Sequence, residues 1–311
     1  MFDTVHFRID RCNISGCNPS EMLHYLSDVT EWKNEKWGYG YTGKAQNYIV
    51  NVSENGISLK GSLAKFHLGN NIETLTRHTT NLAIEQLSDH LHLDLNLAKV
   101  TRLDISTVIP TQRPPTDYFR YLGKKKHFER VQYNSDTLYY ENHQRKIVFY
   151  DKAKEAKKKG VQIPETFKNN NLLRYELSYT KRVKTQFETL VTDVTASTIT
   201  DEVFYRNVIQ NWYNEYKTIQ KLKPPSFIVD NITTITEAET ALFAYLLQQS
   251  GITIDEYISE LKAKNVFKDR QRYSELNIKL NKKITASTIE QQNELMQELG
   301  NKIFAIAKSA M

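Results

Sequence analysis

Three short segments of the chain carry polar residues at every second position. Side chains of a β-strand alternate between two faces, so residues two apart share a face. The residues that share a face in these segments are Arg102, Asp104 and Ser106; Lys146, Val148, Tyr150 and Lys152; and Arg174, Glu176 and Ser178. If the opposite, apolar faces pack on helices, a tyrosine, a lysine and two carboxylates converge on the exposed side of one sheet.

Such a set suits attack by a phenol on a phosphodiester. A phenol with a pKa of about 10 is a weak nucleophile and needs a nearby cation or base, here Lys152 beside Tyr150. A divalent metal, Mg²⁺ or Mn²⁺, held by Asp104 and Glu176 would neutralise the phosphate. The plainer interpretation is a solvated sheet surface with Asp–Arg and Glu–Arg pairs, in which Tyr150 is one of 18 tyrosines and packs like most of them.

Positive charge is concentrated in two stretches of the chain. Residues 120–159 hold twelve basic and five acidic residues, an excess larger than the +6 of the whole chain. Residues 262–283 hold eight basic residues and two acidic ones. Clusters of this kind are typical of surfaces that bind polyanions, although a solvated charged face has the same composition.

Other features narrow the class of protein. No stretch approaches the roughly 18 apolar residues of a membrane span, and the first residues lack the layout of a signal peptide, so we expect a cytoplasmic protein without membrane contact. The two cysteines, Cys12 and Cys17, form at most half of a zinc site and are expected to be plain thiols. A Walker A motif is absent, and so is the residue series of tyrosine recombinases.

The pattern along the chain predicts an α+β protein. Its N-terminal domain, 1–185, should hold a largely antiparallel sheet with packed helices, and 186–311 should be a helical domain for DNA binding or dimerisation. The expected strands are Val5–Ile9, Asn47–Val52, Ile57–Gly61, Val100–Ile109, Thr137–Glu141, Lys146–Lys152 and Leu172–Tyr179. The expected helices are Ile72–Leu91, a short one from Pro115 to Leu122, Glu202–Lys221, Glu237–Gln249, Ile254–Lys264, Lys268–Lys279 and Thr288–Ala307. No internal repeat is visible in the sequence.

Four segments in order resemble one known family. They are GSLAKFHLGNN (61–71), VTRLDIS (100–106), TLYYENHQRKIVFYDKAKE (137–155) and LLRYELSY (172–179). This set is similar to the filamentous-phage gene II/X replication proteins and to plasmid initiators of the Rep_trans-like rolling-circle type. The resemblance covers residues 1 to about 185 and implies an endonuclease and strand transferase that nicks one strand of an origin and keeps the 5′-phosphate on a tyrosine.

The resemblance also implies roles and partners. Tyr150 matches the nucleophile and Lys152 its lysine, while Asp104 and Glu176 match the family's acids; Lys65 and Asn70 fall in a segment whose role is either phosphate contact or loop structure. The partners implied are origin DNA, as duplex and as nicked single strand, a host helicase and polymerase, and a second copy of the chain. Further candidates for DNA contact are Arg102, Lys124, Lys125, Lys126, Arg145, Lys146 and Arg174.

Three alternatives stay open at this point. Residues 89–92, DHLH, match the His-x-His pattern of HUH relaxases, and Tyr150 with Lys154 fits their tyrosine spacing, but His90 falls at the end of an expected helix and not on a strand. Residues 244–276 suit a helix-turn-helix or winged-helix-like unit whose third helix carries Lys268, Arg270 and Arg272, or else a purely structural or dimerising bundle. Finally, the same basic patches suit a non-enzymatic protein that binds an origin or operator.

Overall fold

The structure is a computed structural model, and it describes residues 1–11, 21–34, 38–181, 183–222, 234–250, 254–286 and 294–311. Cys12 and Cys17, which are expected to be plain thiols, lie outside the described residues. The chain divides into two compact units, residues 1–221 with 298–311 and residues 222–297. Each unit is described by itself.

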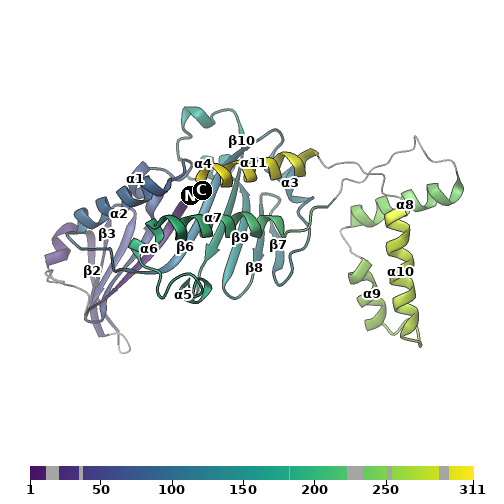
Figure 1. The fold of residues 1–311 in the computed structure, drawn as a ribbon, viewed down its shortest axis with the longest axis horizontal. Helices are drawn as coiled ribbons and strands as arrows, with labels where there is room; N and C mark the ends of the chain where they lie inside the picture. The colour runs from purple at the N-terminus through teal and green to yellow at the C-terminus, as the bar shows by residue number, and fades with distance from the viewer. Residues whose placement is uncertain (12–20, 35–37, 182, 223–233, 251–253, 287–293) are drawn as a thin grey trace. The chain divides into compact units, whose positions relative to one another are not determined.

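The first unit is built on one antiparallel sheet of ten strands, in the order β2-β3-β4-β5-β1-β6-β10-β9-β8-β7 (Figure 1). The strands are β1 Phe2–Asp10, β2 Ser27–Asn34, β3 Gly38–Ala45, β4 Tyr48–Ser53, β5 Gly56–Ser62, β6 Lys99–Thr111, β7 Glu129–Tyr133, β8 Thr137–Glu141, β9 Arg145–Asp151 and β10 Asn171–Tyr179. The α+β class expected from the sequence is therefore confirmed, and so is each expected strand, to within three residues at either end.

The same strand order occurs twice in this sheet. In the half made of β1–β5, strands β2, β3, β4 and β5 form an antiparallel meander. The last strand of this meander, β5, then pairs with β1. In β6–β10 the last strand, β10, pairs in the same way with β6. The two halves join where β1 pairs with β6. The topology thus contains a repeat that is not visible in the sequence. In this repeat, β4 corresponds to β9 and β5 corresponds to β10.

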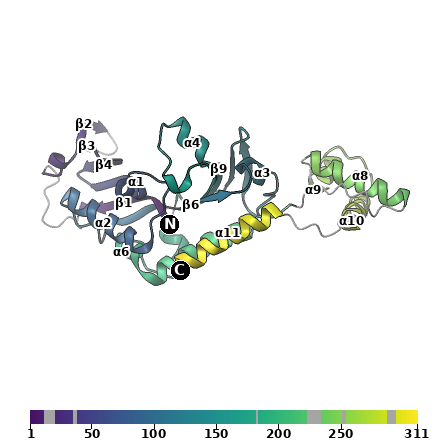
Figure 2. The same ribbon diagram turned by 90° about the horizontal axis from the view of Figure 1, so that it is seen from above.

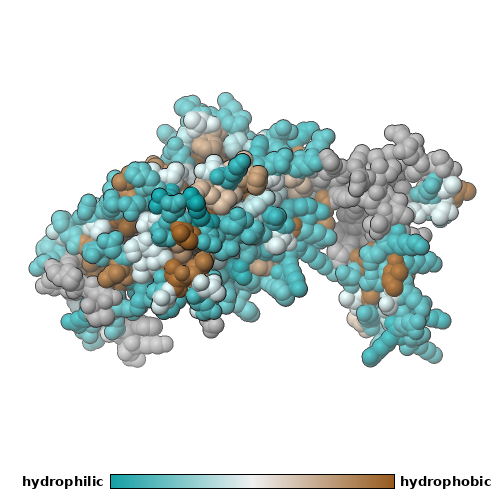
Figure 3. Space-filling model, viewed as in Figure 1, coloured by the Kyte–Doolittle hydropathy of each residue, from teal (hydrophilic) through white to brown (hydrophobic). Residues whose placement is uncertain are grey.

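Helices cover one face of the sheet, as the side view in Figure 2 shows for α11. They are α1 Leu63–Leu68, α2 Arg77–Leu91, α5 Val183–Gln186, α6 Ala196–Thr200, α7 Glu202–Lys217 and α11 Glu294–Ala310. Alternation sends the apolar residues of the strands to this face, where Tyr175 of β10 stacks on Phe149 of β9 and on Trp212 of α7, both at 4.7 Å between ring centroids. Seen from outside, this side is largely hydrophilic with small apolar patches (Figure 3).

The opposite face of the sheet is polar, and among the described residues a helix covers it only at one end. There α4 Lys152–Lys158 and Ile72 pack on Val108 of β6 and Leu172 of β10. In Figure 2, α4 lies on the other side of the sheet from α11. We call the side of the sheet that carries Arg102, Asp104, Tyr150 and Glu176 the polar face.

The remaining helices are short or belong to the second unit. α3 Pro115–Phe119 and the 3-10 helices η2 Glu21–Tyr25 and η3 Glu165–Phe167 lie in the first unit. The second unit holds α8 Ile235–Ser250, α9 Ile254–Ala263 and α10 Gln271–Ala286, with Ile254, Ile258 and Tyr273 as its buried cluster. Among the residues described, no helix is both long and apolar enough to cross a membrane.

The first compact unit extends past the expected domain boundary at residue 185. It takes in α6 and α7, and α11 returns to it after the second unit. The reason is apolar burial, because Leu299, Ile303 and Ala307 of α11 are completely buried. Helices on the C-terminal side of the expected boundary therefore complete the core of the sheet domain.

Candidate functional site

Three neighbouring strands bring the expected site residues together. β10 lies between β6 and β9, so Arg174 stands opposite Tyr150 on one side while Ser178 stands opposite Asp104 on the other. Glu176 lies between Arg174 and Ser178 on the same face of β10, opposite Ser106. Tyr150 and Asp104 thus lie on either side of β10, four residue positions apart along it, and Glu176 lies between those two positions on the same polar face, as alternation predicts.

The centre of this group is a fully buried guanidinium. Arg174 donates to Ser106 Oγ at 2.6 Å and to Glu176 Oε2 at 3.4 Å, and it also bonds the backbone oxygen of Asn71 and the carboxylate of Asp3. Its side chain is 2% exposed. A buried cation is stable only when it is paired and hydrogen-bonded, so this network fixes the position of Arg174.

A β-bulge aims Asp3 at that guanidinium. The pairing of β1 with β6 shifts register between Phe2 and Val5, so that Asp3 and Thr4 together oppose Asp104. An extra residue in one strand re-aims the local side chains. Asp3 was not among the residues expected from the sequence, because the strand expected there begins only at Val5.

Asp104 is held in an unfavourable environment for a carboxylate. Its side chain is 1% exposed and receives three bonds of 2.7–3.1 Å from Arg102. Burial raises the pKa of Asp104 to about 7, and the charge of Glu176 acts in the same direction, while the bonds from Arg102 and Ser178 lower it. A buried carboxylate that faces a second one in this way would be stabilised by an added cation.

Tyr150 lies at the end of β9 with a half-buried side chain. Burial raises the pKa of its phenol well above the usual value, while the charge of Arg174 acts in the opposite direction. Within the described part of the chain its hydroxyl makes no hydrogen bond. The phenol is thus protonated at neutral pH and is not committed to another group.

Lys152 does not share the strand face with Tyr150 as expected. β9 ends at Asp151, whose side chain caps α4 by accepting from the Lys154 N–H at 2.9 Å, and Lys152 is the first residue of that helix. The lysine still reaches the site, because its ammonium donates to Asn71 Oδ1 at 2.8 Å and to Glu155 Oε2 at 2.6 Å and lies 6.0 Å from the centroid of the Tyr150 ring. Burial, and then Arg174, lower the pKa of Lys152.

Two other tyrosines lie close enough in sequence to be rivals of Tyr150. Tyr140 points to the helix-covered face, is completely buried and donates its hydroxyl to the backbone oxygens of Leu122 and Gly123. Tyr139 lies on the polar face, opposite Val148, with the ammonium of Lys146 at 4.2 Å from its ring centroid. Of the two, only Tyr139 could meet a substrate bound on the polar face.

Asp104 and Glu176 are the candidate donors for a divalent metal. No cluster of three or more His, Cys, Asp or Glu suited to a metal occurs among the described residues. Mg²⁺ is commonly held by only one or two carboxylates, with waters and substrate phosphate oxygens in its other positions. The two acids fit such an ion, provided that Arg102 gives up some of its hydrogen bonds to the Asp104 carboxylate.

Comparison with known proteins adds a family to this geometry. Residues 1–203 match the Phage_CRI family model, which describes the N-terminal part of the phage gene II replication-associated protein. The chain belongs to this family. No curated protein matches the sequence significantly. The match spans all ten strands and the helices up to the first residues of α7, so the resemblance to the gene II family extends over the whole sheet of this replication-associated protein.

Three of the residues expected to contact DNA do not present their charge on the open surface of this replication-associated protein. Lys125 is buried and pairs with Glu215 of α7 at 2.7 Å. Arg145 also pairs with Glu215, because it alternates onto the helix-covered face. Arg174 is the buried guanidinium at the centre of the site. The charges of these three residues are engaged in pairs within the protein, and their contact with DNA stays a prediction.

The remaining candidates for DNA contact differ in the exposure and in the contacts of their side chains. Lys124 and Lys126 are exposed, and the half-exposed Lys65 and Lys146 lie on α1 and β9. Asn70 has its amide and carbonyl groups occupied by the loop that follows α1, with bonds of 2.9–3.2 Å to Leu68, Ile72 and Glu73. Of the two roles expected for Asn70, its contacts are those of loop structure, and the adjacent Asn71 is the residue that meets Lys152 and Arg174.

In the second unit, Lys268, Arg270 and Arg272 are all exposed. The helix expected from Lys268 begins instead at Gln271, so only Arg272 lies within α10. Asp269 caps the start by accepting from the Gln271 N–H at 2.9 Å. The expected basic third helix is therefore a basic turn followed by a helix.

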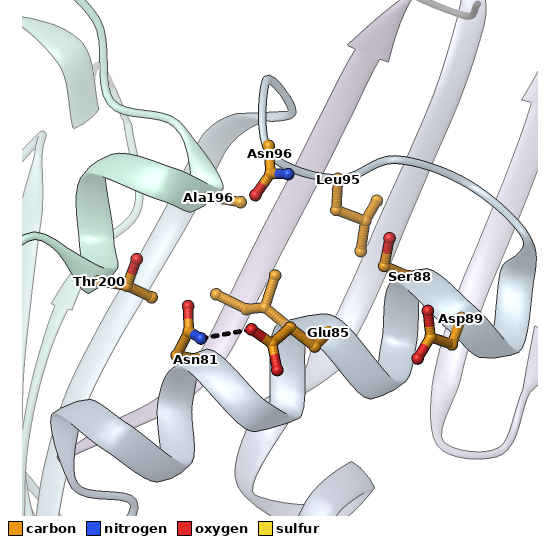
Figure 4. Close-up of a pocket in the computed structure, with 9 residues that line it drawn as sticks. Asn81, Glu85, Ser88, Asp89, Leu95, Asn96, Ala196 and Thr200 are labelled. Atoms are coloured by element: carbon orange, nitrogen blue, oxygen red, sulfur yellow. Dashed lines mark hydrogen bonds between the residues drawn. The ribbon is translucent and has the colours of Figure 1, made fainter.

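Two features of the helix-covered side are not part of this site. His90 lies in the last turn of α2 and His92 caps that helix, so the helical position expected for His90 is confirmed and neither histidine lies on a strand. A hollow of about 350 Å³ lies between α2 and α6, where Figure 4 shows Glu85 and Asp89 opposite Ala196 and Thr200. Its carboxylates make it a poor match for a polyanion.

Proposed function

We propose that this replication-associated protein is a rolling-circle initiator that nicks one strand of its origin through Tyr150. The observation that supports the proposal best is the arrangement of Tyr150, Glu176 and Asp104 on three adjacent strands of the polar face, with the charge of Arg174 directly opposite Tyr150. A phenol, two acids and a fixed cation are the groups that attack on a phosphodiester requires.

In the proposed reaction the Tyr150 oxygen bonds to phosphorus while the bond from phosphorus to the 3′ oxygen breaks. The phenol loses one proton and the leaving oxygen gains one, so the products are a 5′-phosphotyrosyl link and a 3′-hydroxyl. Arg174 and Lys152 favour the phenolate, because both place positive charge near it. A Mg²⁺ or Mn²⁺ ion held by Asp104 and Glu176 would neutralise charge on the phosphate.

The remaining partners follow from this reaction. The 3′-hydroxyl is a primer for a host polymerase, and strand displacement calls for a host helicase. We propose that Lys268, Arg270 and Arg272 of the second unit contact duplex DNA beside the nick, since exposed arginine and lysine release counterions from phosphates. A second copy of the chain is one source of the tyrosine that termination needs.

The test is a nicking assay with a supercoiled plasmid that carries the DNA flanking the gene, in Mg²⁺. The wild-type chain should yield open circles and a protein–DNA adduct, and Tyr150→Phe should lose both by at least about 10³-fold. Tyr139→Phe is the matched control, because it removes a hydroxyl from the same face, and it should retain most of the activity. Normal nicking by Tyr150→Phe would overturn the assignment.

A non-enzymatic origin-binding protein is the second candidate. Two observations favour it: arginines already neutralise both acids, and burial holds the Tyr150 phenol in its protonated form. In the same assay such a protein would shift the mobility of the plasmid fragment without producing open circles.

A further inference from the structure

A second hollow lies on the polar face, in the half of the sheet that lacks Tyr150. Its volume is about 280 Å³, below the roughly 300–1,000 Å³ of pockets that enclose drug-sized ligands. The lining residues are Arg8, Trp32, Asn51, Ser53, Asn55, Gly56, Ile57, Ser58 and Lys60. They come from β1, β2, β4 and β5 and from the turn between β4 and β5.

An aromatic ring forms one wall of this hollow. Trp32 of β2 stands opposite Gly40 of β3, and a Cβ at Gly40 would lie 2.5 Å from Cζ2 of the indole. The ring therefore lies directly against the glycine backbone, in a space that any other residue at position 40 would fill. A tryptophan held on a sheet in this way is a platform on which a nucleobase can stack.

Two cations stand on the other side. The guanidinium of Arg8 is held by Asp10, whose carboxylate accepts from Arg8 Nε at 3.1 Å and from Lys99 Nζ at 2.6 Å. Since Nε makes this bond, the two terminal nitrogens of Arg8, which bond no other group in the described part of the chain, remain as a fork of donors. Lys60 is exposed and forms no ion pair within the residues that the structure describes. Arginine forks and lysines are the groups that bind phosphate oxygens.

The position of the hollow relates it to the site of Tyr150. It lies over β4, β5 and β1, which are the strands that correspond to β9, β10 and β6 in the repeated strand order. Where the second half carries Glu176 and Asp104, this half carries serines, asparagines and cations. From β5 to β9 there are four strand spacings, roughly 20 Å along the face, a distance that a few nucleotides can span.

We propose that this hollow binds one nucleotide of single-stranded DNA, with its base on Trp32 and its phosphate at Arg8 and Lys60. The inference rests on the proposed function for the identity of the polymer, and it assigns the β1–β5 half of the face to holding the strand that Tyr150 attacks. Base stacking on an aromatic ring tolerates any base, so the hollow serves affinity for the single strand and does not read its sequence.

The test measures binding of a fluorescein-labelled dT12 oligonucleotide by anisotropy, without Mg²⁺. Trp32→Ala should weaken binding roughly 5- to 100-fold, the loss of one stacked base, and Trp32→Phe should recover most of the affinity because it keeps an aromatic face. Arg8→Ala should weaken binding and reduce the slope of log affinity against log salt by about 1. Arg206→Ala is the matched control, since this exposed arginine lies on α7 across the sheet and should bind as the wild type.

A second measurement does not depend on comparing affinities of variants. In a Trp37→Phe chain, the indoles that remain of the three are Trp32 and the fully buried Trp212, so quenching of tryptophan emission by dT12 reports on Trp32. Wild-type affinity in both Trp32→Ala and Arg8→Ala, or an absence of quenching, would overturn the proposal.

The two proposals fail separately. If Tyr150→Phe abolishes nicking while Trp32→Ala and Arg8→Ala bind dT12 normally, the proposed nucleotide site in the hollow is wrong and the assignment of Tyr150 as nucleophile is supported. If Trp32→Ala and Arg8→Ala lose affinity for dT12 while Tyr150→Phe nicks normally, the proposed nucleotide site is supported and the assignment of Tyr150 as nucleophile is wrong.

Discussion

At the scale of single residues, the site depends on Arg174, which lies opposite Tyr150 and bonds the carboxylates of Asp3 and Glu176. It is buried with Asp3, Ser106 and the backbone of Asn71 as partners, and it lies opposite Tyr150 on the next strand. Because its charge cannot reach solvent, it acts on its neighbours through a medium that screens little. Arg174 therefore sets both the stability of the strand junction and the electrostatic field at the phenol.

Replacing Arg174 should destabilise the protein strongly. In Arg174→Ala the carboxylate of Asp3 is left buried without its partner, and removal of one member of a buried pair costs about 3–5 kcal/mol. The free energy of unfolding from urea titration measures this loss. Arg206→Ala breaks an exposed pair with Glu202 and should cost less than about 1 kcal/mol. Similar midpoints for the two variants would show that the buried network contributes little.

His6 of β1 gives the molecule a defined dependence on pH. Burial, and then the charges of Arg102 and Lys60, lower the pKa of His6 to about 4. Between the ordinary value of about 6.5 and pH 4, the unfolded chain binds a proton at His6 that the folded chain does not. Its contribution to stability is thus complete above pH 6.5 and is lost as the pH falls toward 4.

The comparison with His6→Gln isolates this contribution. From pH 7 to pH 5 the wild type should lose about 1 kcal/mol more of its unfolding free energy than the variant, a value reduced from the full linkage because solvent reaches the half-buried ring. Urea titrations at both pH values give the difference. An equal loss in the two proteins would mean that His6 titrates normally in the folded state.

At the scale of elements, the end of β9 and the start of α4 position Lys152. Asp151 closes the strand and caps the helix, so Asp151→Ala should cost about 1 kcal/mol and also free the first turn that carries the lysine. Asp201→Ala is matched to it, since Asp201 caps α7 through the same kind of bond, 2.9 Å to the Phe204 N–H. Both variants should lose similar stability, but only Asp151→Ala should slow nicking at a temperature where both are folded. Equal nicking rates would show that the cap does not position Lys152.

The elements that the sequence predicted are those with a strong local signal. β6, β9 and β10 have one apolar face and one polar face, and their alternation predicted which side chains meet. The edge strands β2 and β7, and β3 next to β2, were not predicted, because their exposed positions and the glycines of β3 weaken the alternation. Asp3 and Asn71 were missed for another reason: a bulge and a loop bring them to the site, and neither has a periodic pattern.

At the scale of the whole molecule, the second unit is an insertion between α7 and α11. The chain leaves the first unit at Lys221 and returns at Glu298, after which α11 is tied to the sheet domain by Lys302 Nζ, which donates to the backbone oxygen of Pro110 at 2.7 Å. The Gln112 N–H also donates to Glu298 at 3.0 Å. The C-terminal helix therefore belongs to the core of the sheet domain.

Deleting the insertion tests this organisation. A chain in which a flexible linker of about 12 residues replaces 222–297 should fold, cut a single-stranded oligonucleotide and lose affinity for duplex DNA. A chain ending at Lys221 lacks α11 and exposes the surface that Leu299 and Ile303 bury, so its urea midpoint should fall well below that of the linker variant. If the two chains are equally stable, α11 is not part of the first core.

The identity of the covalently modified residue tests the central claim most directly. The wild-type protein is incubated with an oligonucleotide spanning the nick site in Mg²⁺, digested with nuclease and protease, and the peptide that retains a nucleotide is sequenced by mass spectrometry. The proposed mechanism predicts that the nucleotide mass is on Tyr150, in the peptide that contains the end of β9. A nucleotide on Tyr139 or any other residue, or no adduct under conditions that yield nicked product, would contradict it.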